Sequence, residues 1–179
     1  MDIYEQKFTN MEGEIFSYLT KHVGDVVSQR DIALALAVSP TAIANALKRM
    51  QKADIVHINP LKNIRLVSLN TNSQDILHLK RVENLRQIYT SGLAEFLTSQ
   101  FAGGTIIVFG SYARGEDTSE SDIDIAIIGR NQKQVSFLQY EPKLLRKIHL
   151  NIFKSWDEIP VQLKHNILNG IVIAGCVDL

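Results

Sequence analysis

Cysteine is nearly absent from this chain, because Cys176 is the only one among 179 residues. An internal disulfide and a cysteine-based metal site are therefore excluded, and the apolar stretch around Cys176 predicts that its thiol is buried as a small hydrophobic group. The sequence also lacks an apolar run of the roughly 20 residues that span a bilayer, and residues 1–5 have no signal-peptide character. We therefore expect a cytoplasmic protein that does not contact a membrane.

An excess of charge of one sign is also missing, since 19 Lys and Arg side chains balance 19 Asp and Glu side chains. The balance hides a local asymmetry. Residues 40–65 contain five basic side chains against Asp54, whereas residues 104–128 contain five acidic side chains against Arg114. The basic region suits a polyanion and the acidic region suits divalent cations, so we expect them to bind different ligands.

The first 70 residues predict three helices followed by a β-hairpin. Ser28 can cap the second helix, and Ser39 with Pro40 provides the N-cap and first residue of the third. The turn-rich sequence at 59–62 separates two runs with strand character. This order resembles the winged helix-turn-helix domain, to which we assign residues 1–70. The expected elements are helices at about 11–22, from Gln29 toward Val38 and from Pro40, and strands at 54–58 and 63–69.

The third helix is the expected recognition helix. Its Ile43, Leu47 and Met50 recur at positions i, i+4 and i+7 and face inward, which leaves its polar side chains toward solvent. In a winged domain this helix would enter the major groove of double-stranded DNA. A protein-docking module with a solvated charged face is the alternative, because a basic patch alone is only an electrostatic footprint. The candidate DNA-binding residues are Thr41 and Asn45 for base edges, Lys48, Arg49 and Lys52 on the same helix, and Lys62 and Arg65 for the phosphate backbone.

Residues 71–99 predict one long linking helix or two shorter ones, with a break near Ser91 and Gly92. An apolar stripe runs along this region and can pack on the following sheet or on a second subunit. We favour a homodimer, because helix-turn-helix proteins commonly bind two-fold symmetric sites. Residues 100–179 then predict a small mixed sheet, with a helix at 132–146 except near Pro142 and another at 158–169, so the fold class is α/β (α+β).

The most informative segment lies between Phe109 and Ile128. Thr105–Phe109 reads as a buried strand, and Gly110 follows where the chain must turn. Because Gly110 has no Cβ, a ligand can approach the main chain there, and the Ser111 hydroxyl suits phosphate oxygens. Arg114 adds a guanidinium nearby. These residues predict a phosphate-binding turn.

A second strand is expected to begin at Ser121. Alternation places isoleucines on one face and the side chains of Asp122 and Asp124 on the other. Two carboxylates at this spacing repel each other unless a cation lies between them. Magnesium takes hard oxygen ligands and often binds one or two carboxylates together with substrate phosphates. The pattern therefore predicts a magnesium site beside the phosphate-binding turn.

These two motifs, at residues 110–115 and 121–124, together resemble the signature of the nucleotidyltransferase superfamily that includes polymerase β, and its compact members, the minimal nucleotidyltransferases. The resemblance covers roughly residues 85–179. It implies that Asp122 and Asp124 are the catalytic residues and bind one or two Mg²⁺ ions, and that the nucleoside triphosphate is ATP by analogy. The residues assigned to the nucleotide are Gly110, Ser111, Arg114 and Ser121.

One departure from the family pattern concerns a third carboxylate, which commonly lies on a later strand. The corresponding strand here, residues 147–153, presents His149 and Asn151 at those positions. His149 can ligate a metal or act as a base, Asn151 offers only an uncharged carbonyl oxygen, and both can instead simply face water. Other carboxylates without a spacing argument are Glu141, Asp157 and Glu158.

Two functions remain open from the sequence. In the first, which we favour, an enzyme transfers a nucleoside monophosphate to a hydroxyl acceptor and releases pyrophosphate. The acceptor can be a protein such as a toxin-type ribonuclease, an RNA or a small molecule. In the second, the loss of a carboxylate has weakened catalysis, and the protein is a transcriptional regulator that senses a nucleotide.

Overall fold

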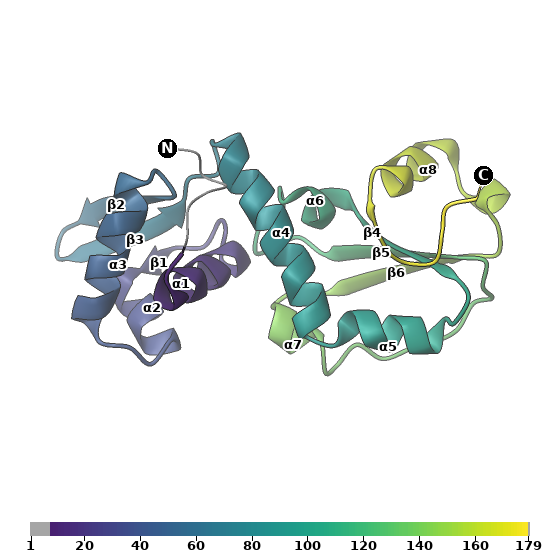
Figure 1. Ribbon diagram of the computed structural model, residues 1–179, viewed down its shortest axis with the longest axis horizontal. Coiled ribbons are helices and arrows are strands. Elements are labelled where there is room, and N and C mark those ends of the chain that lie inside the picture. Colours follow the sequence, from purple (N-terminus) through teal and green to yellow (C-terminus); the bar gives the residue numbers. More distant parts are fainter. Residues whose placement is uncertain (1–7, 179) are drawn as a thin grey trace. The chain divides into compact units, whose positions relative to one another are not determined.

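The computed structural model describes residues 8–178. These residues divide into two compact units at the boundary between Lys80 and Arg81, unit 1 before it and unit 2 after it. Both units combine helices with a sheet (Figure 1), as expected for the predicted α/β (α+β) class. Within residues 8–178 no helix is both long enough and apolar enough to cross a membrane.

Unit 1 is a winged helix-turn-helix fold. Three helices pack against a small antiparallel sheet with the strand order β1-β3-β2, and the hairpin of β2 and β3 is the wing (Figure 1). This order confirms the predicted winged helix-turn-helix fold. The elements are α1 (Asn10–Lys21), β1 (Val27–Ser28), α2 (Gln29–Ala35), α3 (Pro40–Lys52), β2 (Val56–Leu61) and β3 (Ile64–Leu69).

Side-chain caps fix where the three helices of unit 1 begin. Thr9 and Glu12 form a reciprocal capping box at α1, and Ser28 and Asp31 form another at α2. Ser39 accepts from the Ala42 amide at the start of α3, as predicted. Each such cap contributes about 1 kcal/mol to helix stability. The predicted inward face of α3 is also confirmed, since Ile43, Leu47 and Met50 are buried in the core of the unit.

The wing differs from its prediction at Pro60. The turn was expected at residues 59–62, but β2 continues to Leu61 and only Lys62 and Asn63 connect the strands. Pro60 pairs with Arg65 inside the hairpin. A proline is tolerated there because β2 is an edge strand, where the missing N–H can face solvent without loss of a ladder hydrogen bond.

Unit 2 is built on a four-stranded sheet in the order β6-β5-β4-β7, in which β5 and β6 are parallel and the other pairs are antiparallel. The predicted mixed sheet is therefore confirmed. Its strands are β4 (Thr105–Phe109), β5 (Ile123–Ile128), β6 (Ile148–Phe153) and β7 (Ile171–Ala174). The helices are α4 (Gln74–Thr90), which begins in unit 1, α5 (Leu93–Gln100), α6 (Gly110–Arg114), α7 (Glu141–Leu144) and α8 (Val161–Leu168).

Both faces of this sheet are covered, which explains why β4 and β5 are almost continuously apolar. One face, with Ile106, Val108 and Ile125, packs with buried residues of α4 and α5. The opposite face, with Ile107 and Ala126, packs under α8. Figure 1 shows α5 and α8 on opposite sides of the sheet.

Three predictions for unit 2 were wrong. Residues 131–137 are not helical but irregular, because Val135 and Phe137 alternate into the core between exposed neighbours, and only α7 is helical in this region. The last helix begins at Val161, directly after Pro160, and not at residue 158. Cys176 is exposed and not buried, because the chain leaves β7 at Gly175, whose φ is 81°.

The linking region consists of two helices, as the break at Ser91 and Gly92 predicted. Gly92 lies between α4 and α5 with a φ of 84°, a left-handed conformation that suits glycine. The predicted apolar stripe is only partly buried: Ile76 and Ile88 are buried, whereas Val82 is 66% exposed.

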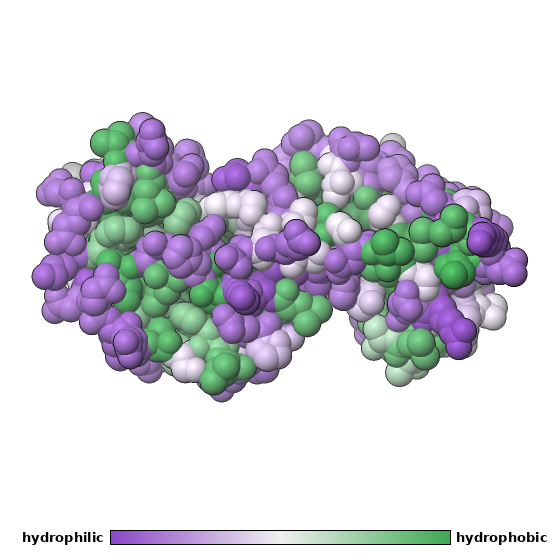
Figure 2. Space-filling view, turned by 180° about the vertical axis from the view of Figure 1, so that it is seen from behind, coloured by the Kyte–Doolittle hydropathy of each residue, from purple (hydrophilic) through white to green (hydrophobic). Residues whose placement is uncertain are grey.

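Hydrophobic side chains also reach the surface in several places, and Figure 2 shows them as green areas between hydrophilic ones. The most exposed large apolar residues include Val26 and Leu34 in unit 1 and Leu138 and Val161 in unit 2. More than half of a typical protein surface is apolar, so these residues do not by themselves mark a binding site.

Candidate active site

Strand pairing brings three sequence-distant segments of unit 2 to one edge of the sheet. Phe109, at the end of β4, lies opposite Asp124 of β5, so the turn at Gly110 begins beside that aspartate. On the other side, Asp124 lies opposite His149 of the parallel strand β6. The structure therefore places Gly110, Asp124 and His149 next to one another.

Gly110 is required here for two reasons. Its φ is 77°, a left-handed conformation that costs a residue with a Cβ roughly 1–2 kcal/mol. In addition, a Cβ at this position would lie 2.6 Å from Oδ2 of Asp124, well inside van der Waals contact. The absence of a side chain at Gly110 thus leaves the space that the Asp124 carboxylate uses.

The Asp124 carboxylate lies between this glycine and the His149 ring. Its Oδ1 is 3.5 Å from His149 Nδ1, and its side chain is 32% exposed. Burial raises the pKa of Asp124 above its ordinary value; the His149 ring opposes this rise, and the Asp122 carboxylate adds to it. Crowding of two carboxylates at a partly buried edge is the electrostatic situation that a bound cation relieves.

Asp122 precedes β5, which begins at Ile123 and not at Ser121 as expected. Its side chain is exposed, on the loop that enters the strand. Ser121 stabilises that loop, because its Oγ accepts from the Thr118 amide at 3.0 Å. Arg114 is exposed and pairs with Glu116, with 2.7 Å between Nε and Oε2. Ser121 and Arg114 thus each make a local contact.

A third carboxylate is not found beside Asp122 and Asp124 in the described chain. Glu141 and Glu158 accept hydrogen bonds from the backbone amides of Ile148 and Lys154. Across residues 8–178, no three His, Cys, Asp or Glu side chains are grouped so as to hold a metal ion.

His149 occupies the place opposite Asp124, while Asn151 pairs further along the strand with Ala126. The two aspartates nevertheless fit magnesium, which usually retains water and takes its remaining ligands from substrate phosphates.

Comparison with known proteins agrees with this geometry. Residues 92–175 match the protein family described as polymerase beta, nucleotidyltransferase. Unit 2 contains a nucleotidyltransferase domain of this family. A Methanocaldococcus jannaschii protein, provisionally named a protein adenylyltransferase, is 38% identical over 71 residues, which are 39% of this chain and 54% of that protein. The chain therefore spans about half the length of the curated relative that it matches.

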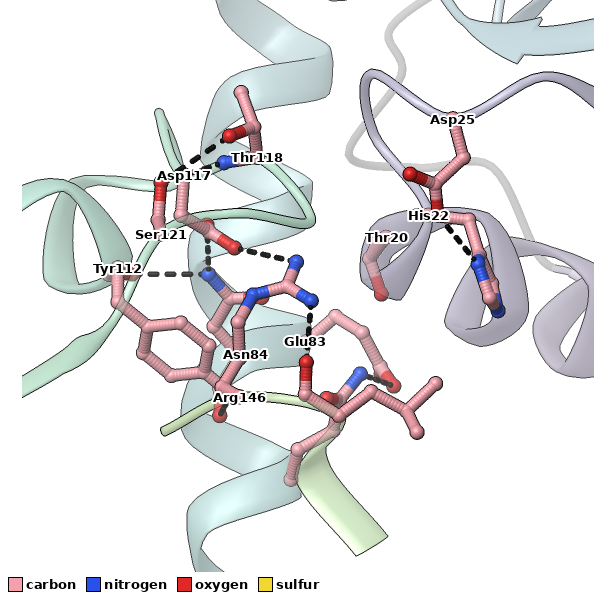
Figure 3. Close-up of polar contacts among 12 residues, drawn as sticks. Thr20, His22, Asp25, Glu83, Asn84, Tyr112, Asp117, Thr118, Ser121 and Arg146 are labelled. Carbon is pink, nitrogen blue, oxygen red and sulfur yellow. Dashed lines mark hydrogen bonds and ion pairs between the residues drawn. The ribbon is translucent and has the colours of Figure 1, made fainter. Parts of the chain in front are cut away.

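A buried polar cluster in the nucleotidyltransferase domain was not predicted. Asp117 had been counted with the acidic residues that suit a cation, but its side chain is buried and accepts hydrogen bonds from Asn84 and Arg146 (Figure 3). Asp117 is therefore not available to a metal. The sequence could not predict this contact from Asn84, because the partners of Asn84 lie 28 or more residues away in the sequence.

The predicted DNA-binding residues lie on α3 and the wing of unit 1. Thr41, Asn45, Lys48 and Lys52 are exposed on α3, whereas Lys62 lies in the two-residue turn of the wing and Arg65 on β3. Arg49 differs from its neighbours, because its Nε donates to Glu12 Oε1 of α1 at 2.7 Å. Its guanidinium thus ties α3 to α1, although the side chain is 55% exposed.

Solved structures similar to this chain include MepR, which is described as a transcription regulator of a Staphylococcus aureus multidrug efflux pump. The Staphylococcus aureus MepR–DNA complex has a TM-score of 0.39 and 21% identity, and the alignment covers 52% of this chain and 77% of that chain. A mutant form of Lactococcus lactis ZitR has a TM-score of 0.41 and 21% identity, and the alignment covers 57% of this chain and 66% of that chain. The winged fold of unit 1 is established by its own strand order.

Proposed function

We propose that this protein is a magnesium-dependent adenylyltransferase that transfers AMP from ATP to a hydroxyl group of a protein acceptor. The observation that supports it is the Asp124 carboxylate held against Gly110, at the end of a strand in a nucleotidyltransferase domain. The choice of a protein acceptor follows the name of the Methanocaldococcus jannaschii relative. A toxin-type ribonuclease is one acceptor of this class.

In this reaction an acceptor hydroxyl oxygen attacks the α-phosphorus of ATP, the bond from that phosphorus to the bridging oxygen breaks, and pyrophosphate leaves. Magnesium, when bound, neutralises the charge of the triphosphate and of the leaving pyrophosphate. Asp122 and Asp124 would hold the metal. Gly110 leaves room for the Asp124 carboxylate beside the turn, and the Ser111 hydroxyl and the Arg114 guanidinium are suited to the oxygens of the triphosphate.

A second function is favoured by one specific observation: within residues 8–178, no third carboxylate is grouped with Asp122 and Asp124. Loss of a metal ligand in a metal-assisted displacement slows the chemical step more than it weakens nucleotide binding. In this alternative the domain binds Mg²⁺ and ATP without turnover, and unit 1 responds as a transcriptional regulator.

We also propose that unit 1 binds double-stranded DNA. The exposed Thr41 and Asn45 of α3 would contact base edges, and Lys48, Lys52 and the wing would contact phosphates. A homodimer on a two-fold symmetric DNA site and a cytoplasmic location remain predictions.

The proposal is tested with α-labelled ATP, Mg²⁺ and the purified protein, with and without cell extract. We expect label on a protein band that protease removes and ribonuclease does not, with release of pyrophosphate. The double variant Asp122→Asn with Asp124→Asn should show neither labelling nor nucleotide binding. Binding of ATP by the unaltered protein without any label transfer would favour the regulator, and ribonuclease-sensitive label would replace the protein acceptor with RNA.

A further inference from the structure

Three polar side chains are buried together inside the nucleotidyltransferase domain. Asn84 of α4, Asp117 between α6 and β5, and Arg146 just before β6 are 2%, 1% and 5% exposed. A buried charge is costly unless it is paired and hydrogen-bonded, and apolar residues often stabilise such a position as well or better. The buried aspartate and arginine are therefore weak evidence for core stability, and their neighbours in the chain indicate what else they do.

The contacts of this cluster join three segments of the chain (Figure 3). Asn84 Nδ2 donates to Asp117 Oδ1 at 2.7 Å and to the carbonyl oxygen of Tyr112 at 2.9 Å. Arg146 Nη2 donates to Asp117 Oδ2 at 3.2 Å. The Tyr112 hydroxyl donates back to the carbonyl oxygen of Asn84 at 3.3 Å. Both oxygens of Asp117 are thus used, each by a donor from a different segment.

The segments that Asn84 of α4 and Arg146 join to Asp117 lie next to the candidate site in the sequence. Tyr112 follows Ser111 in α6, Asp117 lies in the loop that ends at Asp122, and Arg146 precedes the strand that carries His149. The starts of the two strands are also joined, because the Ile123 amide donates to the carbonyl oxygen of Lys147 at 2.8 Å. The cluster therefore contacts the chain next to the predicted phosphate-binding turn and close to the starts of β5 and β6.

Asp117 has a particular place within the loop from Glu116 to Asp122. It is the only residue of that loop that is buried, since the others are exposed or half-buried. No apolar side chain in the loop can take over this anchoring. Asp117, with its donors Asn84 and Arg146, is thus the buried anchor of the loop that delivers Asp122 to the site.

We propose that Asp117 is a positioning residue for the metal–nucleotide site, and that Asn84 and Arg146 hold it in place for this purpose. The proposal rests on the proposed function, because it assumes that Asp122 and Asp124 bind a metal with a nucleotide. Outer partners of metal ligands typically change metal affinity by about 10–100-fold when replaced. We expect an effect in that range on the combined binding of metal and ATP.

The experiment measures binding of Mn²⁺ in the presence of ATP by the full chain, using the loss of the free-ion electron paramagnetic resonance signal. Asp117→Asn removes the charge and is expected to weaken binding about 10–100-fold. Asn84→Ala is the second variant, for the case in which Asp117→Asn does not fold. It removes one donor to Asp117 but keeps the Asp117–Arg146 ion pair, so no buried charge is left unpaired. It is also expected to weaken Mn²⁺–ATP binding.

Leu97→Ala is the matched control for lost stability. Leu97 is fully buried in the core of the same domain and takes no part in the polar cluster. Leu97→Ala should lower the melting temperature. At a temperature where all variants are folded, it should leave the Mn²⁺–ATP affinity unchanged. Equal affinity in the unaltered protein, Asp117→Asn and Asn84→Ala would overturn the positioning role while the function stands. Absence of Mn²⁺–ATP binding in the unaltered protein would instead overturn both.

Discussion

The acidic edge of the sheet in unit 2 and the basic face of α3 in unit 1 are built in opposite ways. At the acidic edge, strand pairing brings Gly110, Asp124 and His149 together from three segments, and a single Cβ would collide with a carboxylate oxygen. On α3, by contrast, Lys48 and Lys52 stand one turn apart on one helix and point into solvent.

This difference predicts different sensitivity to mutation. Activity at a site built from several segments is lost when a catalytic group moves by about 1 Å, because metal and nucleotide binding require defined positions of their ligands. A charged surface acts through the sum of its charges, each of which contributes a modest, salt-screened increment. A single substitution at the acidic edge should therefore abolish most of the activity, whereas each substitution on the basic face should lower DNA affinity by a small amount.

The largest effect is expected for Gly110→Ala. The new methyl group would displace the Asp124 carboxylate, and alanine is strained at the left-handed conformation of this residue. Nucleotidyl transfer should fall by about 100-fold or more, since misplacement of a catalytic group by about 1 Å can cost this much. Label transfer from α-labelled ATP measures the loss.

Gly129→Ala is the matched control for that substitution. Gly129 has a φ of 83° and follows the other end of β5, but no atom lies within 4 Å of the position where its Cβ would be. It shares the backbone strain and lacks the collision. If both variants lost activity equally, strain and not the contact with Asp124 would explain the requirement for glycine.

A gradual effect is expected for Lys48→Ala with Lys52→Ala. If both side chains contact phosphates, the slope of log Kd against log salt concentration should decrease by about 2, because each phosphate contact contributes roughly 0.9. Fluorescence anisotropy with a DNA duplex at several salt concentrations measures this slope. The control pair Lys133→Ala with Lys154→Ala removes two exposed charges from unit 2, and a slope that changes equally in both pairs would count against groove docking by α3.

How far the sequence predicts this structure depends on the range of the interactions involved. In unit 1, Ser28 and Ser39 cap helices through contacts with residues only three positions away, so the helix starts could be predicted. Pro60 was misread because its neighbours suggested a turn, whereas its tolerance in β2 depends on the edge position of that strand. Strand order cannot be read from a local pattern.

The candidate site shows the same division. Alternation predicted that His149 and Asn151 share a face of β6, but only the strand register shows that His149, and not Asn151, lies opposite Asp124. Asp117 and Asp124 are both aspartates of one acidic stretch. Their separate environments depend on Arg146 and Gly110, and no local pattern distinguishes them before the chain is folded.

The smallest effect concerns Arg49, the basic residue of α3 that bonds to Glu12. Burial raises the pKa of the Glu12 carboxyl, but hydrogen bonds from Thr9 and Arg49 outweigh burial, so its pKa lies below the ordinary value of 4.5. A carboxyl with a lowered folded-state pKa stabilises the fold above its unfolded pKa, and this contribution is lost as the pH falls through the folded pKa.

Glu12→Gln should therefore lower the free energy of unfolding by about 1 kcal/mol at pH 7, as expected for the loss of a partly exposed charged contact. The difference from the unaltered protein should shrink as the pH falls below the ordinary carboxyl pKa, which urea unfolding at several pH values measures. The same variant releases Arg49 from its carboxylate partner and removes one negative charge near α3, so duplex binding should tighten slightly and its salt dependence should steepen. A less stable variant with unchanged DNA affinity would show that Arg49 serves only to hold α1 against α3, and would remove it from the basic face altogether.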